Sequence, residues 1–329
     1  MEPLDFLAIG DIVIEPFIKL TDAETYEKDG QQMLGMRFGD KIPYESSTLL
    51  PAVGNASNAA VAAARLGVPS ALRAYVGGDP YAKECLDRLT EEHVQTEYMV
   101  TQAEKHTNYH YVLWYGNERT ILVKHESFDY EVPTLGHQPK WIYLSSLAAN
   151  SLSYHHEITE MLALYPAIKL AFQPGTFQMS LGVEALKPLY ERTDFFVVNV
   201  EEAGRILGTP HERDPKVLMQ GLAQLGPKLI SLTDGTNGAY AYDGMRFLRV
   251  PMYPDTRGPF ERTGAGDAFA SSITAAMALG KPFEEALLWG PINSMSVVQD
   301  VGAQKGLLTR EQLEDYLANA PSEYRVTEF

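Results

Sequence analysis

The sequence predicts an α/β protein with three layers, in which a mainly parallel β-sheet lies between two layers of helices. From residue 141 to the C-terminus, short apolar runs typical of buried strands alternate with helical patterns, and this alternation favours parallel strands joined by crossover helices. Two segments, at residues 16–50 and 107–124, break the pattern and predict a small β-sheet lid over the site. We expect residues 1–329 to form one domain with the lid arms inserted in it.

The bulk composition is that of a globular protein with enough apolar residues for a large core. Of the 329 residues, 45% are apolar and 21% are charged. The formal charge of −16 argues against nucleic acid and against an anionic membrane as partners. No apolar run reaches the roughly 18 residues of a membrane span, and residues 1–5 lack a signal peptide's basic region. We therefore expect a cytoplasmic protein.

Several motifs of other protein classes are missing from the sequence. There is no Gly-x-x-x-x-Gly-Lys-Ser/Thr loop, which excludes a P-loop enzyme. No Gly-x-Gly-x-x-Gly follows the first strand, and the Gly-x-Ser-x-Gly of an α/β hydrolase is absent. His155 and His156 look exposed and have no evident third ligand, so we assign them a structural role. The single cysteine, Cys85, has no partner for an internal disulfide and no zinc-ligand spacing around it.

The N-terminal apolar run, residues 4–14, predicts a buried strand. Gly10 and Asp11 interrupt this run, which indicates a break where another group approaches the backbone closely. Asp11 is either a turn residue or a ligand for substrate at this break. Glu15 follows directly after the run and adds a second carboxylate.

A small-residue helix is predicted to start after Gly54 and to end at Leu66, before the C-cap Gly67. Its small residues would let a sugar lie against the backbone, while Asn55 and Asn58 would offer amide donors and acceptors. The alternative is structural, because Asn is also a common N-cap residue. That alternative suits Asn55 better than Asn58.

The remaining elements follow from apolar runs and turn residues. A hairpin is expected over residues 108–115 and 119–124 around Gly116 and Asn117, and a short strand near 33–38. Further strands are expected at residues 71–76, 141–145, 168–172, 195–198, 229–233 and 239–242. The last three helices are expected near residues 264–279, 283–300 and 310–318.

The stretch with the most specific chemistry runs from Gly264 to Asp267. Gly264, Ala265 and Gly266 stand at the start of a predicted helix, where uncovered N–H groups and the helix dipole favour an anion such as phosphate. Asp267, in the first turn, is a candidate base for a hydroxyl that attacks phosphorus. On local chemistry alone, a loop ending in a helix cap explains the same residues equally well.

Two other segments place polar or glycine residues directly after predicted strands. Asn199 and Glu202 follow a buried strand at the spacing of a capping box, which by itself is the favoured interpretation. Residues 233–238 form a glycine-rich turn between two predicted strands, and an ordinary hairpin turn explains them too.

The stretch from Thr263 to Asp267, followed by a small-residue helix, resembles the C-terminal signature of the ribokinase or PfkB family of carbohydrate and nucleoside kinases. This resemblance implies a ribokinase-like fold, with Asp267 as catalytic base and the amides of Gly264, Ala265 and Gly266 as an anion hole. The chain departs from the family by carrying Glu261-Arg262 in place of Asp-Thr, and Val53 in place of the first glycine of the N-terminal signature.

The same resemblance assigns roles to residues elsewhere in the chain. It implies that the acceptor substrate is bound by Asp11, Glu15, Gly54, Asn55 and Asn58. It implies that ATP is bound by Asn199, Glu202, Thr233, Gly235, Gly238 and Asn293. Glu202 would hold Mg²⁺ through water, and Gly302-Ala303-Gln304 resembles a tail element beside a monovalent-cation site, for which K⁺ is the candidate.

Together, these motifs predict an ATP-dependent kinase that phosphorylates a hydroxymethyl group of a sugar or a nucleoside such as ribose, fructose or adenosine. One alternative is a kinase of phosphosugars, of the 6-phosphofructokinase type, which would need cations such as Arg37, Lys41, Arg119 and Lys124 of the lid arms. Another is a non-catalytic sugar- or nucleotide-binding regulator of the same fold. An exposed lid would also favour a homodimer.

Overall fold

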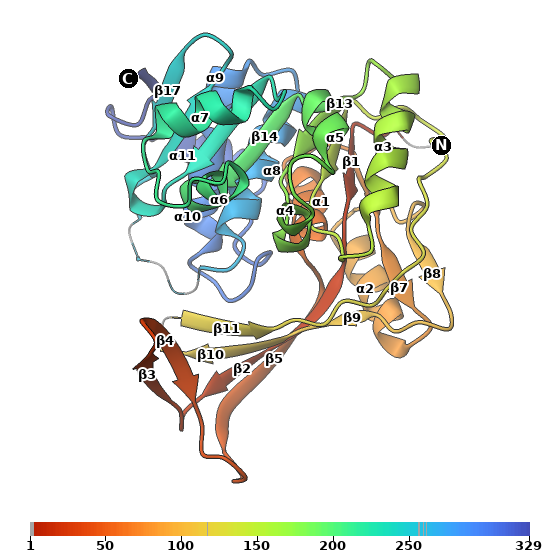
Figure 1. Cartoon of the computed structure of the whole chain (residues 1–329), viewed down its shortest axis with the longest axis vertical. Coiled ribbons are helices and arrows are strands. Elements are labelled where there is room, and N and C mark those ends of the chain that lie inside the picture. The colour runs from red at the N-terminus through yellow and green to blue at the C-terminus, as the bar shows by residue number, and fades with distance from the viewer. Residues whose placement is uncertain (1–2, 117, 256, 259, 261) are drawn as a thin grey trace.

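The central element of the computed structural model is a twisted sheet between two layers of helices (Figure 1). The structure describes residues 3–329 except 117, 256, 259 and 261. In these residues the sheet has nine strands in the order β18-β17-β16-β15-β14-β13-β12-β1-β6. These strands are β1 (Phe6–Ile9), β6 (Ser70–Arg73), β12 (Trp141–Leu144), β13 (Lys169–Phe172), β14 (Phe195–Asn199), β15 (Leu229–Thr233), β16 (Ala239–Tyr242), β17 (Phe247–Val250) and β18 (Thr327–Glu328).

In this sheet the neighbouring strands β6, β1, β12, β13, β14 and β15 pair in parallel. Strands β16, β17 and β18 add an antiparallel edge. The strands are apolar on both faces because each face is covered. In β1, for example, Phe6 and Ala8 face one hydrophobic cluster, and Leu7 and Ile9 face the other. The predicted mainly parallel sheet with covered faces is confirmed.

Each hydrophobic cluster joins one layer of helices to the sheet. The first layer contains α1 (Asn55–Arg65), α2 (Pro80–Glu91), α8 (Ala265–Ala278), α9 (Phe283–Ala286), α10 (Trp289–Val297) and α11 (Arg310–Ala318). The second contains α3 (Leu152–Leu164), α5 (Lys187–Arg192), α6 (Val200–Ile206) and α7 (Pro215–Ala223), and α4 (Thr176–Leu181) follows β13. Among the described helices, none combines the length and the apolar content that a membrane-spanning segment requires.

A second, smaller sheet projects from one end of the central domain (Figure 1). Its order is β11-β10-β2-β5, formed by β2 (Val13–Leu20), β5 (Tyr44–Val53), β10 (Tyr111–Tyr115) and β11 (Glu118–Leu122), with β9 (Asn108–Tyr109) beside β2. A hairpin of β3 (Glu24–Lys28) and β4 (Gln31–Gly35) lies at its far end. We call the second sheet and this hairpin the lid. Both predicted lid arms, residues 16–50 and 107–124, contribute to it.

Some predicted elements differ from the structure. The strand expected at 71–76 is split, because after β6 the chain leaves the central sheet and β7 (Tyr75–Gly77) pairs with β8 (Val100–Gln102). The helix expected at 283–300 is broken into α9 and α10. Pro291 lies in the first turn of α10, where its missing N–H costs no helical hydrogen bond. The strand expected near 33–38 is β4, which ends at Gly35, and Asn117 of the predicted turn lies outside the described residues.

The prediction that His155 is exposed is wrong. His155 is fully buried, with Nε2 at 2.8 Å from Gln178 Nε2 and Nδ1 at 2.6 Å from the carbonyl oxygen of Ser151. Burial lowers the pKa of its imidazole to about 4. A neutral histidine packed in this way supports the structural role that we assigned to it.

Candidate active site

A cavity of about 310 Å³, which we call the catalytic cleft, lies where the carboxyl ends of parallel strands meet the N-terminal ends of α1 and α8. It is the place where α/β proteins bind ligands. Its lining includes residues from β14 and β15, from both helices and from the lid strand β11. Among them are Glu15, Gly54, Asn55, Asn58, Gln173, Asn199, Glu202, Thr233, Gly264, Ala265, Gly266 and Asp267.

Helix α8 begins at the cleft with its N-terminal amides uncovered. Gly264 is the N-cap and has φ +81°, and a Cβ there would lie 2.5 Å from Cβ of Ala303. Only glycine fits both conditions. The chain therefore brings the amides of Ala265 and Gly266 to the cleft with no side-chain cap on them, which is the geometry that binds anions.

Asp267 lies in the first turn of α8 and is buried beneath the cleft. Three side-chain amides donate to its carboxylate: Asn55 Nδ2 to Oδ1 at 2.7 Å, Asn58 Nδ2 to Oδ2 at 2.8 Å, and Gln173 Nε2 to Oδ1 at 3.2 Å. Burial raises the pKa of Asp267 above its ordinary value, and the nearby charge of Glu15 adds to this effect. The three hydrogen bonds oppose it.

The structural alternative for the first asparagine of α1 is wrong. The N-cap of α1 is Gly54, and Asn55 is the first helical residue, with its side chain on Asp267. Gly54 has φ +112°, and a Cβ there would lie 2.7 Å from the carbonyl oxygen of Asp11. The backbone of Gly54 therefore packs tightly against the break in the N-terminal apolar run. Ala56 also packs at that break, because a Cβ added to Gly10 would lie only 2.7 Å from the Cβ of Ala56.

A second cavity of about 470 Å³ adjoins the catalytic cleft and shares Glu15, Gly54 and Asn55 with it. We call it the acceptor cavity. The lid contributes Ile121 of β11, and the chain after β11 contributes Val123 and His125. The rest of its lining is Asp11, Val13, His110, Ser146, Thr176 and Phe177.

Asp11 lies in the acceptor cavity, but both of its carboxylate oxygens already have partners. Oδ2 is 2.8 Å from Nδ1 of His125, and Oδ1 accepts from the hydroxyl of Tyr130 at 2.9 Å. Asp11 lies in the connection between β1 and β2, where the turn-residue alternative places it, and its side chain fixes His125. Glu15 is paired in a similar way, with Oε1 at 3.4 Å from Nδ1 of His110.

His110 and His125 were not among the predicted site residues. A signal for them exists, because one precedes β10 and the other follows β11, and strands paired in a hairpin bring such flanking residues together. Their rings lie 5.0 Å apart in an edge-to-face arrangement, and both line the acceptor cavity. Gln173 was missed for a different reason. It follows strand β13, whose end is not marked by any motif.

Asn199 and Glu202 form the capping box of α6, so the structural interpretation of this motif is correct. Asn199 Oδ1 accepts from the Glu202 amide at 2.8 Å, and Glu202 Oε2 accepts from the Asn199 amide at 2.9 Å. Both residues also line the catalytic cleft. Burial raises the pKa of Glu202, and the capping bond and Arg205 oppose that rise. Capping occupies only Oε2, so the same carboxylate can take part in a metal site.

The part of the chain that the structure describes contains no cluster of three or more His, Cys, Asp or Glu side chains that would hold a metal by themselves. The lining of the catalytic cleft would instead suit a hydrated Mg²⁺. A single carboxylate would orient such an ion through water, beside the phosphate oxygens of a nucleotide. Glu202 is the carboxylate that suits it.

A third cavity, of about 290 Å³, lies on the other side of the start of α8. Thr233, Gly235 and Gly238, which the family resemblance assigned to ATP, line this cavity. Its walls are largely apolar and include Tyr253, Phe269, Pro291, Met295 and Val298. We call it the nucleotide cavity because a largely apolar cavity beside a helix start that can bind an anion suits a nucleotide base.

The geometry does not support the predicted base contact of Asn293. This side chain is fully buried outside the lining of the nucleotide cavity, where it donates to Ser272 Oγ at 2.8 Å and accepts from the Leu308 amide at 2.9 Å. It joins α10 to α8 and to the segment before α11. The neighbouring Ser294, one position further around α10, lines the cavity instead.

Thr233, Arg262, Ala265 and Gly266 line both the catalytic cleft and the nucleotide cavity. Arg262 is the charged member of this shared set, and it is exposed. Arg119 of the lid lines the catalytic cleft. Glu261, the other departure from the family signature, lies outside the described residues.

Comparison with known proteins identifies the family of this chain. The family described as "pfkB family carbohydrate kinase" matches residues 30–310. The chain belongs to this family of carbohydrate kinases. Over 290 residues it is 27% identical to a ribokinase of Bacillus subtilis (strain 168), with 85% of this chain and 94% of the relative covered. It is 29% identical to a fructokinase of Vibrio alginolyticus, with 72% and 80% covered.

Solved structures of ribokinase-family members share the fold. The ribokinase of Arabidopsis thaliana, solved with ribose and ATP, superposes with a TM-score of 0.79 at 18% identity, covering 96% of this chain and 99% of that chain. The nucleoside kinase of Methanocaldococcus jannaschii, an archaeal ribokinase-family member, gives a TM-score of 0.78 at 18% identity with the same coverage. The predicted ribokinase-like fold is confirmed.

Proposed function

We propose that this carbohydrate kinase transfers the γ-phosphoryl group of ATP to a hydroxymethyl group of an unphosphorylated sugar or nucleoside. The observation that carries the proposal is the position of Asp267. Its carboxylate lies in the first turn of α8, at the helix start that separates the acceptor side from the nucleotide cavity. A base at that point can reach an acceptor hydroxyl while the uncovered amides hold the group being transferred.

In this mechanism Asp267 accepts the proton of the attacking hydroxyl. The amides of Gly264, Ala265 and Gly266 then stabilise the charge on the phosphoryl group in flight, helped by the positive end of the α8 dipole. Little covalent chemistry is asked of the protein, because phosphoryl transfer depends mainly on positioning and charge stabilisation. Closure of the lid would keep water from competing with the acceptor.

On the nucleotide side, the apolar cavity would hold the base, and Thr233, Gly235 and Gly238 would lie along the ribose and phosphates. Asn199 and Glu202 would orient a hydrated Mg²⁺, which when bound neutralises charge on the phosphate oxygens. Arg262, which lines both cavities, is positioned to meet a phosphate between them. A K⁺ requirement remains a prediction from the resemblance near Gly302-Ala303-Gln304.

An unphosphorylated acceptor is supported by the charges of the acceptor cavity. Its charged lining consists of Asp11 and Glu15 with their paired histidines, and its described lining contains no lysine or arginine. A phosphate group there would meet two carboxylates. Among the lid cations, Arg37 is bound to Asp22 and Asp40 on the exposed hairpin side. We therefore rank a phosphosugar acceptor below a neutral one, with Arg119 of the catalytic cleft as its best support.

The lid also supports a homodimer as a second part of the proposal. Large apolar side chains are exposed on it and on the connection between β4 and β5, including Met36, Phe38, Tyr44, Leu49 and Leu122. A monomer rarely leaves such a group uncovered. Light scattering of the purified protein should give twice the chain mass, and a single chain mass would contradict this part.

The experiment that tests the function is ATP consumption with Mg²⁺ and K⁺ across adenosine, other nucleosides, ribose, fructose and fructose 6-phosphate, with Asp267→Ala alongside. We expect turnover with one neutral acceptor and none in the variant. If no acceptor stimulates ATP consumption while sugars or nucleotides still raise the melting temperature, the non-catalytic regulator is the better conclusion.

A further inference from the structure

Each side-chain amide around Asp267 can be oriented in two ways. Asn55, Asn58 and Gln173 each carry one end that donates and one that accepts. A carboxylate base needs the donating end, because a carbonyl oxygen turned toward it would repel its charge. Something must therefore fix which end of each amide faces Asp267.

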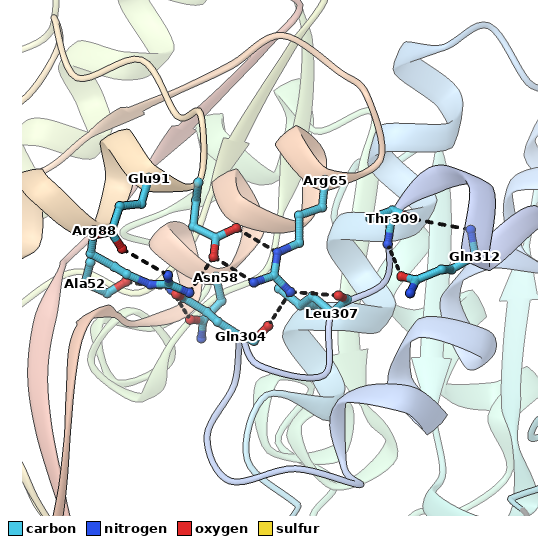
Figure 2. A network of polar contacts seen from close by, with 10 residues as sticks. Ala52, Asn58, Arg65, Arg88, Glu91, Gln304, Leu307, Thr309 and Gln312 are labelled. Atoms are coloured by element: carbon cyan, nitrogen blue, oxygen red, sulfur yellow. Dashed lines mark hydrogen bonds and ion pairs between the residues drawn. The ribbon is translucent and has the colours of Figure 1, made fainter.

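For Asn58, that fixing group is Gln304 (Figure 2). Gln304 Nε2 donates to Asn58 Oδ1 at 3.2 Å and to the carbonyl oxygen of Ala52 at 2.7 Å. A backbone carbonyl only accepts, so it forces the NH₂ group of Gln304 to that side. This NH₂ in turn holds the oxygen of Asn58, and the NH₂ of Asn58 is left to face Asp267. Gln304 and Asn58 are both buried, so water cannot replace either bond.

The segment that carries Gln304 is itself clamped. Nη1 of Arg65 in α1 donates to the carbonyl oxygens of Gln304 and Leu307 at 2.8 and 2.7 Å. The other edge of the same guanidinium makes two bonds of 2.7 Å to the carboxylate of Glu92. A planar group bound on two edges has little freedom to turn. Arg65 therefore holds the main chain of Gln304 in place.

For Gln173, the fixing group is a phenol. The hydroxyl of Tyr143 in β12 donates to Gln173 Oε1, which leaves the NH₂ of Gln173 for Asp267. Burial and the charge of Asp267 keep the pKa of Tyr143 well above its ordinary value, so the hydroxyl stays protonated and remains a donor. The ring is fixed by stacking on Phe6 at 5.6 Å.

We infer that Gln304 and Tyr143 are positioning residues for the base, because through Asn58 and Gln173 they turn N–H groups toward the carboxylate of Asp267 and keep it ionised. Neither residue touches substrate or the transferred group. The inference rests on the proposed function, in which Asp267 acts as an ionised base. It assigns a role to Gln304, which the family resemblance placed in a tail element beside a monovalent-cation site.

The test uses Gln304→Met and Tyr143→Phe, which remove the two donors with little change in shape. In each variant, the acid limb of kcat/KM for the acceptor should move to higher pH by about one unit, giving about a tenfold loss below the limb and near-normal rates on the plateau above it. The KM for ATP should stay the same. Matched controls are Gln95→Met and Tyr190→Phe, whose side chains lie outside all three cavities.

Two results would overturn the inference: an unchanged profile in both variants, or an equal loss at every pH, which is the signature of a purely structural role. A second readout does not depend on kinase activity. In protein labelled with ¹³C at aspartate carboxyls, with the Asp267 resonance identified from Asp267→Asn, both variants should show a higher titration midpoint for Asp267. If the wild type phosphorylates no acceptor, the proposed function fails, while this titration still decides the amide polarity.

Discussion

The central domain and the lid differ most in how completely they are buried. In the central sheet, β1, β12 and β14 are almost entirely enclosed. In the lid, β3 and β4 are exposed along most of their length, and β5 is exposed over its first half. Asp267 and its amide donors belong to the enclosed part. His110 and Ile121 line the acceptor cavity from the lid arms. The proposed base thus belongs to the enclosed part of the molecule, whereas part of the acceptor-cavity lining belongs to the lid.

Two buried aspartates of the central domain differ from each other in the groups that surround them. Asp194 stands before β14, and Arg192 and Lys228 donate to it at 2.9 and 2.8 Å. Although burial alone would raise its pKa, these partners and the Leu170 amide hold it below its ordinary value. Asp267, at the opposite ends of the strands, is bonded to amides that carry no charge, and its pKa is raised. A carboxylate without a cation partner is ready to take a proton.

The largest expected effect comes from substituting each of these two aspartates in turn. Asp267→Asn should lower kcat by about 10³–10⁴-fold because the base is lost, while ATP binding measured by calorimetry stays within about twofold of wild type. Asp194→Asn is the matched control. It should reduce the free energy of unfolding by about 3 kcal/mol and leave kcat unchanged. A normal kcat in Asp267→Asn would remove the catalytic assignment.

The next effect tests the clamp that ties α1 to the segment after α10. Arg65→Met leaves Glu92 with Arg88 as its cation partner and leaves two carbonyl oxygens without their donor. At pH 7 we expect a loss of about 2–3 kcal/mol in the free energy of unfolding, measured with urea. The control Lys83→Met removes an exposed ion pair in α2 and should cost less than about 0.5 kcal/mol.

The effect of Arg65→Met should depend on pH in a defined direction. Burial alone would raise the pKa of Glu92, but hydrogen bonds and charges from Arg65 and Arg88 bring it below its ordinary value of 4.5. A lowered folded-state pKa gives stability that is present above that ordinary value and is lost as pH falls through the folded-state pKa. The stability difference between wild type and variant should therefore narrow below pH 4.5. A constant difference would mean that packing, rather than the ion pair, is what was removed.

The contrast between the two regions also explains what the sequence could predict. The positions of most central strands along the chain, the Gly264–Asp267 stretch and the capping box of Asn199 were accessible because each is a local pattern of strand, turn and helix start. The donors to Asp267 were not, because Asn58 lies 209 positions away from it and Gln173 lies 94 positions away. Pairings of that range follow from sheet order and lid pairing, which no local spacing encodes.

The direction of a side chain on a helix was a further limit. Asn293 was assigned to the nucleotide, yet its side chain is engaged with other protein groups. Which residue of α10 faces the cavity depends on how that helix is rotated against α8, and a rotation of one position exchanges Asn293 for Ser294. The apolar pattern alone does not fix such a rotation.

At the root of the lid, Glu15 should act on acceptor binding more than on the chemical step. Glu15→Gln keeps the shape but removes a charge that lies between the catalytic cleft and the acceptor cavity. We expect the KM of the acceptor to rise about tenfold, as loss of a charged hydrogen bond would give, with the KM of ATP unchanged. The control Glu45→Gln alters an exposed lid carboxylate paired with Lys19 and should change neither constant. Equal losses for both substrates would place Glu15 in the general structure of the cleft.

The smallest effect is expected on the outer surface of the lid. Leu122 is 53% exposed, so Leu122→Ala should change the free energy of unfolding by less than about 0.5 kcal/mol in the isolated chain. Leu144→Ala, the same substitution in fully buried β12, should cost about 2–5 kcal/mol. Thermal unfolding of both variants at low and high protein concentration makes the comparison decisive. A loss at Leu122 that grows with concentration would mean that a second chain buries the lid, because only an interface makes an exposed leucine matter in that way.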